Sequence, residues 1–420
     1  MTLDGTGHTL ARVHRRPPAA LGLIIALIAI VASCDSGAAG PTARSTIGST
    51  ARPATPAPTV HPVPGHEVYG FLPYWEMDDT IAAHVEATFL TTLGLFSVTN
   101  ARDGSIDTTQ NGYRRITGDS GAQLIREARQ RGVRTELVFT SFGSDRNTRL
   151  FEDLALQDAA IRNLVALATR LGVDGINVDV ESLPPTLVPA YGAFVGRLRN
   201  AVLVANPNGQ VSAATAANTL GAAMAVAAAD SGADRIFLMG YDYHSAGSSP
   251  GASAPLARRD GSPKDLGWSL DMYADLGVPV DRTVLGLPLY GMAWPVAGPV
   301  IGAPQTGRGD PWIPRQHLDV LADPSIVPLR DGIEVVEVYL LASDGSIGVP
   351  TEPASGGPGG ADDRTWRAVY IDSPATLAGK LALANERGLA GAGLWAIGYE
   401  RGLPAFTDLI ASFGAGATLP

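Results

Sequence analysis

Residues 174–181 read Asp-Gly-Ile-Asn-Val-Asp-Val-Glu, and this stretch decides the fold. Its polar residues Asn177, Asp179 and Glu181 stand two positions apart, so on a strand they share one face while the apolar residues between them share the other. In a barrel covered by helices, the apolar face packs against the helices and the polar face points inward. Two carboxylates on an interior face are expensive to bury, which favours a site. A structural hydrogen-bond network inside the barrel is the alternative.

Short apolar runs alternate with helical patterns over residues 66–415. Four helices are predicted most clearly, over residues 121–131, 158–171, 191–205 and 374–387, the last with Ser373 as N-cap and Gly388 as C-cap. Eight strand–helix units predict an α/β fold of the (β/α)8 TIM barrel type, with an open doubly wound sheet as the alternative. The eight predicted strands cover residues 68–72, 93–98, 135–141, 175–181, 211–216, 235–241, 284–289 and 391–397.

One connection is too long for a simple loop. The chain between Met292 and about Ala368 separates the seventh strand from its helix, and structureless loops of that length are unusual in compact domains. Residues 333–338 and 367–371 have strand-like sequences, and 355–363 is rich in glycine. We therefore predict a small α+β insertion, over about residues 295–368, between strand 7 and helix 7.

The first 33 residues have the sequence of a secretory signal. Arg12, Arg15 and Arg16 precede an apolar run over residues 19–31, which is shorter than the roughly 20 residues that span a bilayer. Val-Ala-Ser then leads to Cys34, the single cysteine. This exit resembles the lipobox of bacterial lipoproteins, in which the cysteine becomes the lipidated first residue. An uncleaved N-terminal anchor is the alternative.

Residues 34–65 are predicted to form a disordered linker after the lipidated cysteine. They are rich in Pro, Ala, Ser and Thr and contain almost no large apolar residue, so they cannot bury enough surface to offset the entropy of ordering. We thus expect a folded domain held by its lipid on the extracellular side of the bacterial cell membrane. Together the segments are a signal peptide at 1–33, a linker at 34–65 and a barrel at 66–415.

The composition excludes several classes of function. The formal net charge of −10 argues against a nucleic-acid partner, which needs a basic surface. A lone cysteine cannot form an internal disulfide or a thiolate cluster. No cluster of His, Asp and Glu has metal-ligand spacing and no glycine-rich phosphate loop follows a strand, so we expect no metal and no cofactor. We expect a monomer.

The position of each carboxylate on the fourth strand predicts its role. Glu181 is the last residue, nearest the open end of the barrel, and a neighbouring acid and partial burial would raise its pKa. A carboxyl group kept protonated in this way suits a general acid. Asp179 lies deeper, beside Asn177, and is expected to stay ionised.

The strand resembles the signature Asp-Gly-x-Asp-x-Asp-x-Glu of glycoside hydrolase family 18, the chitinase and N-acetylglucosaminidase family, at Asp174, Gly175, Asp179 and Glu181. Residues 239–242 resemble the family's Met-x-Tyr-Asp, and residues 286–291 resemble its Gly-x-Pro-x-Tyr-Gly. Residues 70–75 resemble its first-strand region and Trp395 the tryptophan of its sugar subsite. The resemblance covers residues 66 to about 415.

The resemblance implies a retaining, substrate-assisted hydrolysis of β-1,4-linked N-acetylglucosamine polymers. Glu181 would be acid and then base, while the sugar's acetamido oxygen attacks C1 to form an oxazolinium ion. Asp179 would orient the acetamido group and Tyr241 would bond its carbonyl. Other substrate contacts are expected from Asn177, Asp242, Trp395, Tyr290 and Tyr74.

Asn177 departs from the family pattern, which usually has Asp there. An Asp can share a proton with Asp179 during turnover, whereas Asn can only donate a hydrogen bond that keeps Asp179 ionised. The same Asn occurs in the branch of spore-cortex-lytic enzymes, which favours peptidoglycan or short oligosaccharides over crystalline chitin. A catalytically silent sugar-binding protein is the competing interpretation, although silent relatives commonly lose the acid that Glu181 keeps.

Overall fold

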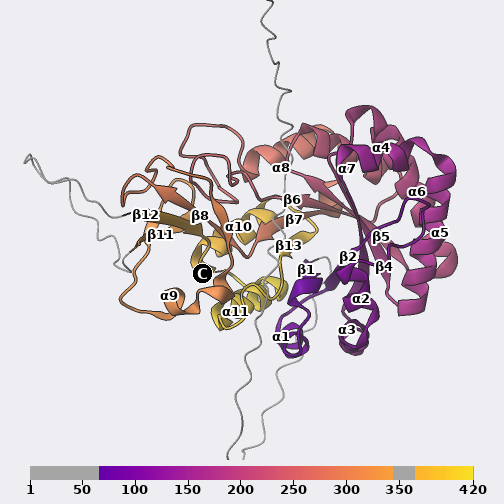
Figure 1. Cartoon of the computed structure of the whole chain (residues 1–420), viewed down its shortest axis with the longest axis horizontal. Coiled ribbons are helices and arrows are strands. Elements are labelled where there is room, and N and C mark those ends of the chain that lie inside the picture. Colours follow the sequence, from indigo (N-terminus) through magenta and orange to yellow (C-terminus); the bar gives the residue numbers. More distant parts are fainter. Residues whose placement is uncertain (1–65, 344–364, 420) are drawn as a thin grey trace, which may run out of the picture. The chain divides into compact units, whose positions relative to one another are not determined.

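The computed structural model describes residues 66–343 and 365–419, and eight of its strands close into a barrel (Figure 1). Every strand is parallel to both neighbours, with the last strand lying between the first and seventh. The predicted TIM barrel is therefore confirmed. Its strands are β1 (Glu67–Pro73), β2 (Thr92–Val98), β3 (Arg134–Phe142), β4 (Gly175–Glu181), β5 (Gln210–Ala216), β6 (Arg235–Met239), β7 (Thr283–Pro288) and β13 (Gly391–Trp395).

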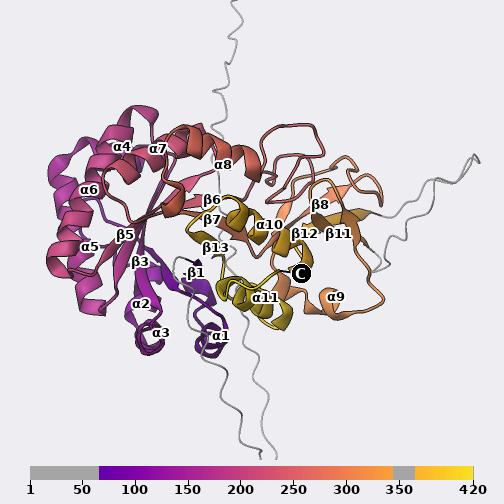
Figure 2. The same ribbon diagram turned by 180° about the vertical axis from the view of Figure 1, so that it is seen from behind.

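Helices connect the strands and cover the barrel, and Figure 2 shows the last two beside the strands that close it. The four predicted helices correspond to α3, α5, α6 and α10, and Ser373 caps α10 as expected. In the described part of the chain, no helix is long and apolar enough to cross a membrane. The helices are α1 (Ile81–Ala87), α2 (Asn111–Thr117), α3 (Asp119–Gln130), α4 (Ser144–Glu152), α5 (Leu154–Leu171), α6 (Val188–Ala205), α7 (Thr219–Asp230), α8 (Leu266–Asp275), α10 (Pro374–Glu386) and α11 (Pro404–Gly414).

The two faces of β4 separate as its alternation predicts. Ile176 and Val178 are fully buried in the same core as Leu164 of α5 and Phe194 of α6. Asn177 bonds to a side chain of β5, inside the barrel. Burial of the apolar face against helices stabilises the fold by roughly 1.5–3 kcal/mol for each large side chain, and it fixes the direction of the polar face.

An antiparallel sheet is inserted between β7 and α10, and its orange strands lie beside the barrel in Figure 1. The order β10-β11-β12-β8-β9, with the short helix α9 (Leu318–Ala322), has the α+β content that was expected. The glycine-rich stretch 355–363 lies outside the described residues, as do residues 1–65. The strands are β8 (Gly291–Val296), β9 (Asp310–Trp312), β10 (Leu329–Asp331), β11 (Val336–Ala342) and β12 (Trp366–Ile371).

One predicted strand in the insertion is displaced. Of the predicted residues 333–338, only 336–338 lie in a strand, because β11 begins at Val336 and residues 333–335 form a turn after β10. The Asp331 carboxylate accepts hydrogen bonds from the main-chain N–H groups of Ile333 (2.9 Å) and Glu334 (3.2 Å), and Val335 has a φ of 57°. An Asp that bonds to following amides stabilises a turn over a strand. The second prediction, 367–371, corresponds to β12.

Candidate active site

The two carboxylic acids of β4 lie at different depths. Asp179 is buried, whereas Glu181 ends the strand and is partly exposed. Burial raises the pKa of Glu181 to about 7, and the charge of Asp242 adds to this effect. Burial also raises the pKa of Asp179 well above its usual range, with a further contribution from the charge of Glu181. The pair therefore retains at least one proton near neutral pH, which is the condition for acid catalysis.

The expectation that Asn177 keeps Asp179 ionised is wrong for the substrate-free protein. The Asn177 side-chain amide donates instead to the Ser212 hydroxyl over 2.7 Å. Within residues 66–343 and 365–419, Oδ1 of Asp179 has no hydrogen-bond partner. A buried carboxylate without donors is costly to ionise, which explains the raised pKa of Asp179.

Ser212 connects Asn177 to a third acid inside the barrel, Glu136 of β3, which the sequence analysis did not identify. The Glu136 carboxylate accepts from Tyr69 (2.8 Å), Gln210 (2.9 Å) and Ser212 (2.5 Å). Its pKa is raised by burial, although the three hydrogen bonds oppose the shift. The only signal in the sequence was a lone acid within an apolar strand. With three partners, Glu136 is a structural group that links β3 across the barrel interior to β1 and β5, each two strands away.

Tyr241 and Asp242 follow β6, which ends at Met239, two residues earlier than predicted for this strand. Burial raises the pKa of Tyr241 well above its usual range, and the charges of Asp179, Asp242 and Glu181 contribute in that order. The Tyr241 hydroxyl therefore lies within the field of all three carboxyl groups. Asp242 adopts a φ of 62°, a left-handed conformation in which Asp is tolerated more readily than most residues.

Asp242 is held by two hydroxyl groups. Tyr290, which follows β7, donates to its Oδ1, and the Ser253 hydroxyl accepts from its main-chain N–H over 3.1 Å. Ser253 and Tyr290 are themselves 3.2 Å apart, oxygen to oxygen. The Tyr290 hydroxyl, predicted as a substrate contact, is thus engaged with Asp242 in the substrate-free protein. This hydrogen bond orients the Asp242 carboxylate, whose charge helps to raise the pKa of Glu181.

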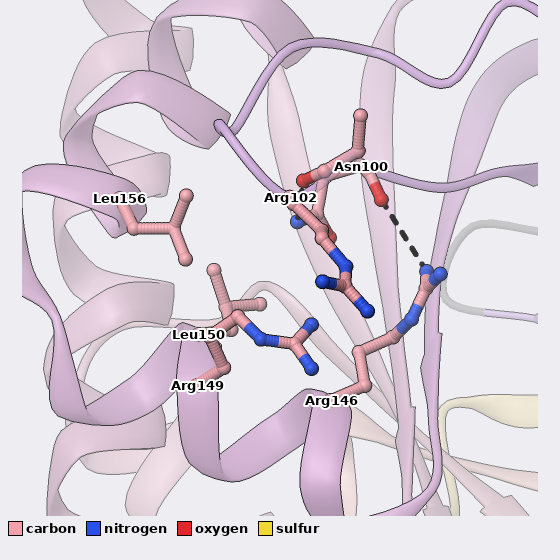
Figure 3. A pocket seen from close by; sticks show the side chains of 7 residues that line it. Asn100, Arg102, Arg146, Arg149, Leu150 and Leu156 are labelled. Carbon is pink, nitrogen blue, oxygen red and sulfur yellow. Dashed lines mark hydrogen bonds between the residues drawn. The ribbon is translucent and has the colours of Figure 1, made fainter.

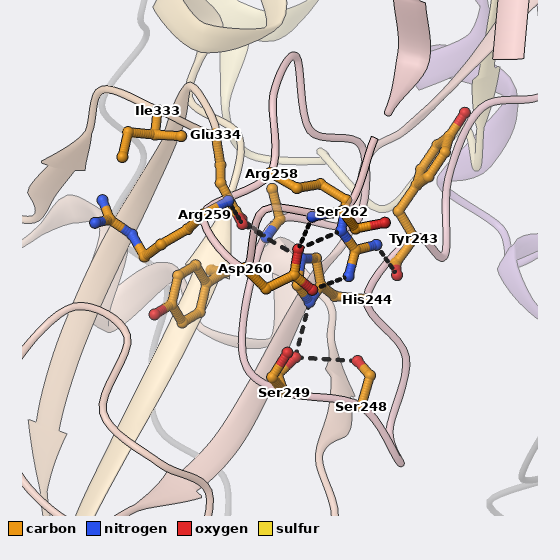
Figure 4. Close-up of polar contacts among 12 residues, drawn as sticks. Tyr243, His244, Ser248, Ser249, Arg258, Arg259, Asp260, Ser262, Ile333 and Glu334 are labelled. Atoms are coloured by element: carbon orange, nitrogen blue, oxygen red, sulfur yellow. Dashed lines mark hydrogen bonds and ion pairs between the residues drawn. The ribbon is translucent and has the colours of Figure 1, made fainter. Parts of the chain in front are cut away.

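Ser253 belongs to the loop between β6 and α8, and the insertion holds this loop in place (Figure 4). The Glu334 carboxylate accepts from the main-chain N–H groups of Ala252 (2.6 Å) and Arg259 (3.0 Å). It also lies 3.3 Å from Nε2 of His244. His244 is only 1% exposed, so it is buried between the loop and the insertion. The insertion thereby supports the loop that contacts Asp242.

Aromatic rings surround Trp395 at the end of β13. Its ring centroid lies 4.7 Å from that of Phe96, 5.7 Å from Phe71 and 6.4 Å from Trp75. Trp75 is 42% exposed and donates from Nε1 to the Tyr399 hydroxyl over 3.1 Å. Tyr74, the residue predicted to contact substrate, is partly buried against the main core. The exposed aromatic of this segment is therefore Trp75, which the sequence analysis passed over.

A single interior cluster packs against both Tyr241 and Trp395, which brings the acids and the aromatic rings to the same end of the barrel. In TIM barrels the reaction takes place at the C-terminal ends of the strands. Acids with raised pKa values beside apolar ring surfaces are suited to a sugar ring and its glycosidic oxygen. Fold and site together are those of the glycoside hydrolase class.

The comparison with protein families agrees, because residues 68–400 match the model for glycosyl hydrolases family 18. The chain belongs to this family. It is 26% identical to the cortical fragment-lytic enzyme of Bacillus anthracis over 220 residues, 49% of this chain and 46% of that protein. It is 25% identical to mouse chitotriosidase-1 over 173 residues, 39% of this chain and 33% of that protein. The alignments thus span less than half of these relatives.

Solved structures share the fold over most of the chain. The spore cortex-lytic enzyme SleL of Bacillus cereus superposes with a TM-score of 0.62 at 19% identity, over 83% of this chain and 74% of that one. A family 18 chitinase from Cycas revoluta, in complex with (GlcNAc)3, gives a TM-score of 0.65 at 18% identity, over 83% and 99%. At these identities the likeness establishes the barrel.

Proposed function

We propose that the chain hydrolyses β-1,4-linked N-acetylglucosamine glycans, peptidoglycan or chitin oligosaccharides, with retention and with assistance from the substrate. The carrying observation is the raised pKa of Glu181, about 7, at the open end of β4. Membership of the family and the (GlcNAc)3 bound by the Cycas revoluta chitinase support the substrate class.

In the proposed reaction, protonated Glu181 gives its proton to the glycosidic oxygen as the bond to C1 breaks. The carbonyl oxygen of the 2-acetamido group attacks C1 and forms an oxazolinium ion. Asp179 orients this group and, in its ionised form, stabilises the positive charge, and the Tyr241 hydroxyl donates to the acetamido oxygen. Glu181, now ionised, takes a proton from the water that opens the ring. Asp242, Trp395 and Trp75 are assigned to substrate binding, while the buried Asn177 bonds Ser212 on the same face of β4 as Asp179.

The test is turnover of chitooligosaccharides and purified peptidoglycan by wild type, Glu181→Gln and the control Glu152→Gln, which changes an exposed acid of α4. We expect Glu181→Gln alone to abolish turnover. An oligosaccharide without acetamido groups should not be cleaved by wild type, since it lacks the nucleophile. Turnover that survives Glu181→Gln would refute the mechanism. Binding of the sugars without turnover by wild type would favour the silent sugar-binding protein.

We also propose that lipid on Cys34 anchors the enzyme outside a bacterial cell membrane. The support is the sequence of residues 1–34, with its arginines, short apolar run and small residues before the cysteine. Cys34→Ala should abolish labelling by a radioactive fatty acid and release the protein from membranes. Ser33→Ala, which keeps a small residue before the cysteine, should leave labelling unchanged. Labelling that persists in Cys34→Ala would disprove the anchor.

A further inference from the structure

Three arginines line one small pocket at the junction of the β2 loop with α4 and α5, outside the Asp179 and Glu181 site (Figure 3). Their guanidinium groups lie around a common space, with Leu150 and Leu156 forming an apolar wall. The principal lining residues are Asn100, Arg102, Arg146, Arg149, Leu150 and Leu156.

The three arginines differ in their contacts. Arg146 donates to the Thr99 hydroxyl and to the Asn100 main-chain oxygen (3.4 Å), so it fixes the loop after β2. Hydrogen bonds from Thr109 and Gln110 lower the pKa of the nearby Asp107, and the charge of Arg146 adds a smaller contribution. Throughout residues 66–343 and 365–419, by contrast, no side chain or main-chain oxygen accepts a hydrogen bond or forms an ion pair with Arg102 or Arg149.

Such a concentration of positive charge is unfavourable by itself. Like charges that lie close together repel, although solvent screens part of the repulsion between the exposed Arg102 and Arg149. The chain as a whole is acidic, with a net charge of −10, so the pocket stands out against its surroundings. An anion between the guanidinium groups would remove the repulsion, and a carboxylate matches the paired N–H groups of arginine particularly well.

The pocket is connected to the catalytic strand by α4. Asn147, which follows Arg146 directly, donates from its side-chain amide to the main-chain oxygen of Glu181 over 2.6 Å. The main-chain N–H of Gly143, just before α4, donates to the same oxygen over 3.2 Å. The helix α4 therefore contacts the end of β4 through Asn147 and lines the pocket with Arg146 and Arg149. A glycan lying across the strand ends could carry a side group to this pocket.

We propose that the arginine pocket binds a carboxylate of an acidic, peptide-bearing glycan while the neutral sugar chain lies at Glu181. This inference rests on the proposed function and narrows its substrate to peptidoglycan-type polymers. Chitin has no carboxylates, so it has no group that the arginine pocket would bind. Leu150 and Leu156 are buried in the main core and close the pocket on its inner side. Arg102 and Arg149 provide the charge, and Arg146 holds the loop that carries Arg102.

Binding, measured apart from turnover, tests the pocket. Titration calorimetry on the Glu181→Gln background would compare two probes of equal sugar length, a chitooligosaccharide and a soluble peptidoglycan fragment with its peptides. The site variant is Arg102→Gln with Arg149→Gln. The matched control is Arg126→Gln with Arg162→Gln, which removes two exposed charges from α3 and α5 that do not line the pocket.

We expect the peptidoglycan fragment to bind more tightly than the chitooligosaccharide, with a preference of roughly ten-fold from two exposed charge contacts. The site variant should lose that preference while its affinity for the neutral probe stays unchanged, and the control should retain it. Absence of a preference, its survival in the site variant, or an equal loss in the control would overturn the proposal. A wild-type protein that shows the preference but cleaves neither polymer would instead contradict the proposed hydrolysis and leave the pocket standing.

Discussion

The side-chain amide of Asn147 donates a hydrogen bond to the main-chain oxygen of Glu181, over 2.6 Å. Asn147 is fully buried, and its Oδ1 accepts from the Ser141 hydroxyl over 2.7 Å. The backbone that carries the proposed acid is thus held from α4, a helix that contributes no reacting group. Asn147 is accordingly a positioning residue, and its effect on catalysis passes through the geometry of the end of β4.

Asn147→Ala should lower both stability and turnover. It leaves the Glu181 carbonyl oxygen with one donor fewer and the Ser141 hydroxyl without its acceptor, which typically costs about 1–3 kcal/mol of unfolding free energy. Because the acid then sits less well against the glycosidic oxygen, kcat should fall more than KM changes. Urea unfolding and steady-state kinetics measure the two effects. Asn163→Ala is the control, because Asn163 donates to the main-chain oxygens of Gly104 and Ala159, away from β4; an equal loss of kcat there would contradict the positioning role.

In a plot of kcat/KM against pH, the alkaline limb should begin near pH 7. Glu181 must be protonated to act as the acid, and its pKa is raised to about 7. Above that pH, kcat/KM should fall about ten-fold per pH unit, as for a single ionisation. Asp242→Asn removes the negative charge that helps to raise this pKa, so the limb should move to lower pH. A limb that stays in place in Asp242→Asn would show that the charge of Asp242 does not act on Glu181.

The same shift predicts a stability that depends on pH. An acid whose pKa is higher in the folded protein than in the unfolded chain stabilises the fold at low pH, and this contribution disappears as the pH rises through the folded pKa. For Glu181 the change should lie between its ordinary value near 4.5 and about 7. Glu181→Gln, which cannot ionise, should therefore unfold with a flatter pH profile in that window. Equally steep profiles for the two proteins would assign the dependence to other groups.

The eight strand–helix units predicted the barrel, and the alternation within residues 174–181 was then sufficient to predict the inward direction of Asn177, Asp179 and Glu181. It was sufficient because the two-residue period of a strand fixes which side chains share a face. The partner of Asn177 could not be predicted, since Ser212 is 35 positions away in the chain. The Asn177 amide was expected to stabilise the ionised form of Asp179, but it donates to Ser212 on the neighbouring strand β5. Asp179 was therefore expected to be ionised, whereas burial raises its pKa.

Two other differences from the sequence predictions have local physical causes. Residues 333–338 are apolar enough for a strand, but Asp331 accepts from two main-chain amides and turns the chain before β11 begins. At the end of β1, the sequence offers Tyr74 and Trp75 side by side. Only the packing shows that Tyr74 joins the core while Trp75 remains 42% exposed near Trp395. Neighbouring aromatics cannot be assigned to core or surface before the surrounding elements are in place.

Asn177→Asp should destabilise the protein, and more strongly at high pH. The new carboxyl would be fully buried on the same face as Asp179 and would lack the donor through which Asn177 bonds Ser212. Its folded pKa should be raised, so the variant loses stability as the pH rises through that value. Unfolding in urea at pH 5 and pH 8 would measure this. Asn177→Ala loses the hydrogen bond to Ser212 without adding an acid, so its loss of stability should vary less with pH. If both variants lose stability equally at both pH values, ionisation of the new Asp carboxyl is excluded as the cause.

Glu334→Ala should loosen the loop between β6 and α8 and weaken substrate binding. The Glu334 carboxylate is the acceptor for the buried main-chain N–H group of Ala252, one residue before Ser253, and for that of Arg259. Without it these amides should exchange their hydrogens faster, since hydrogen exchange reports local opening. Ser253 would then hold Asp242 less firmly, so KM should rise. Glu337→Ala is the matched control, because Glu337 accepts from Arg330 and Ser373 and not from this loop. Faster exchange in both variants would mean that the insertion as a whole, and not Glu334, secures the loop.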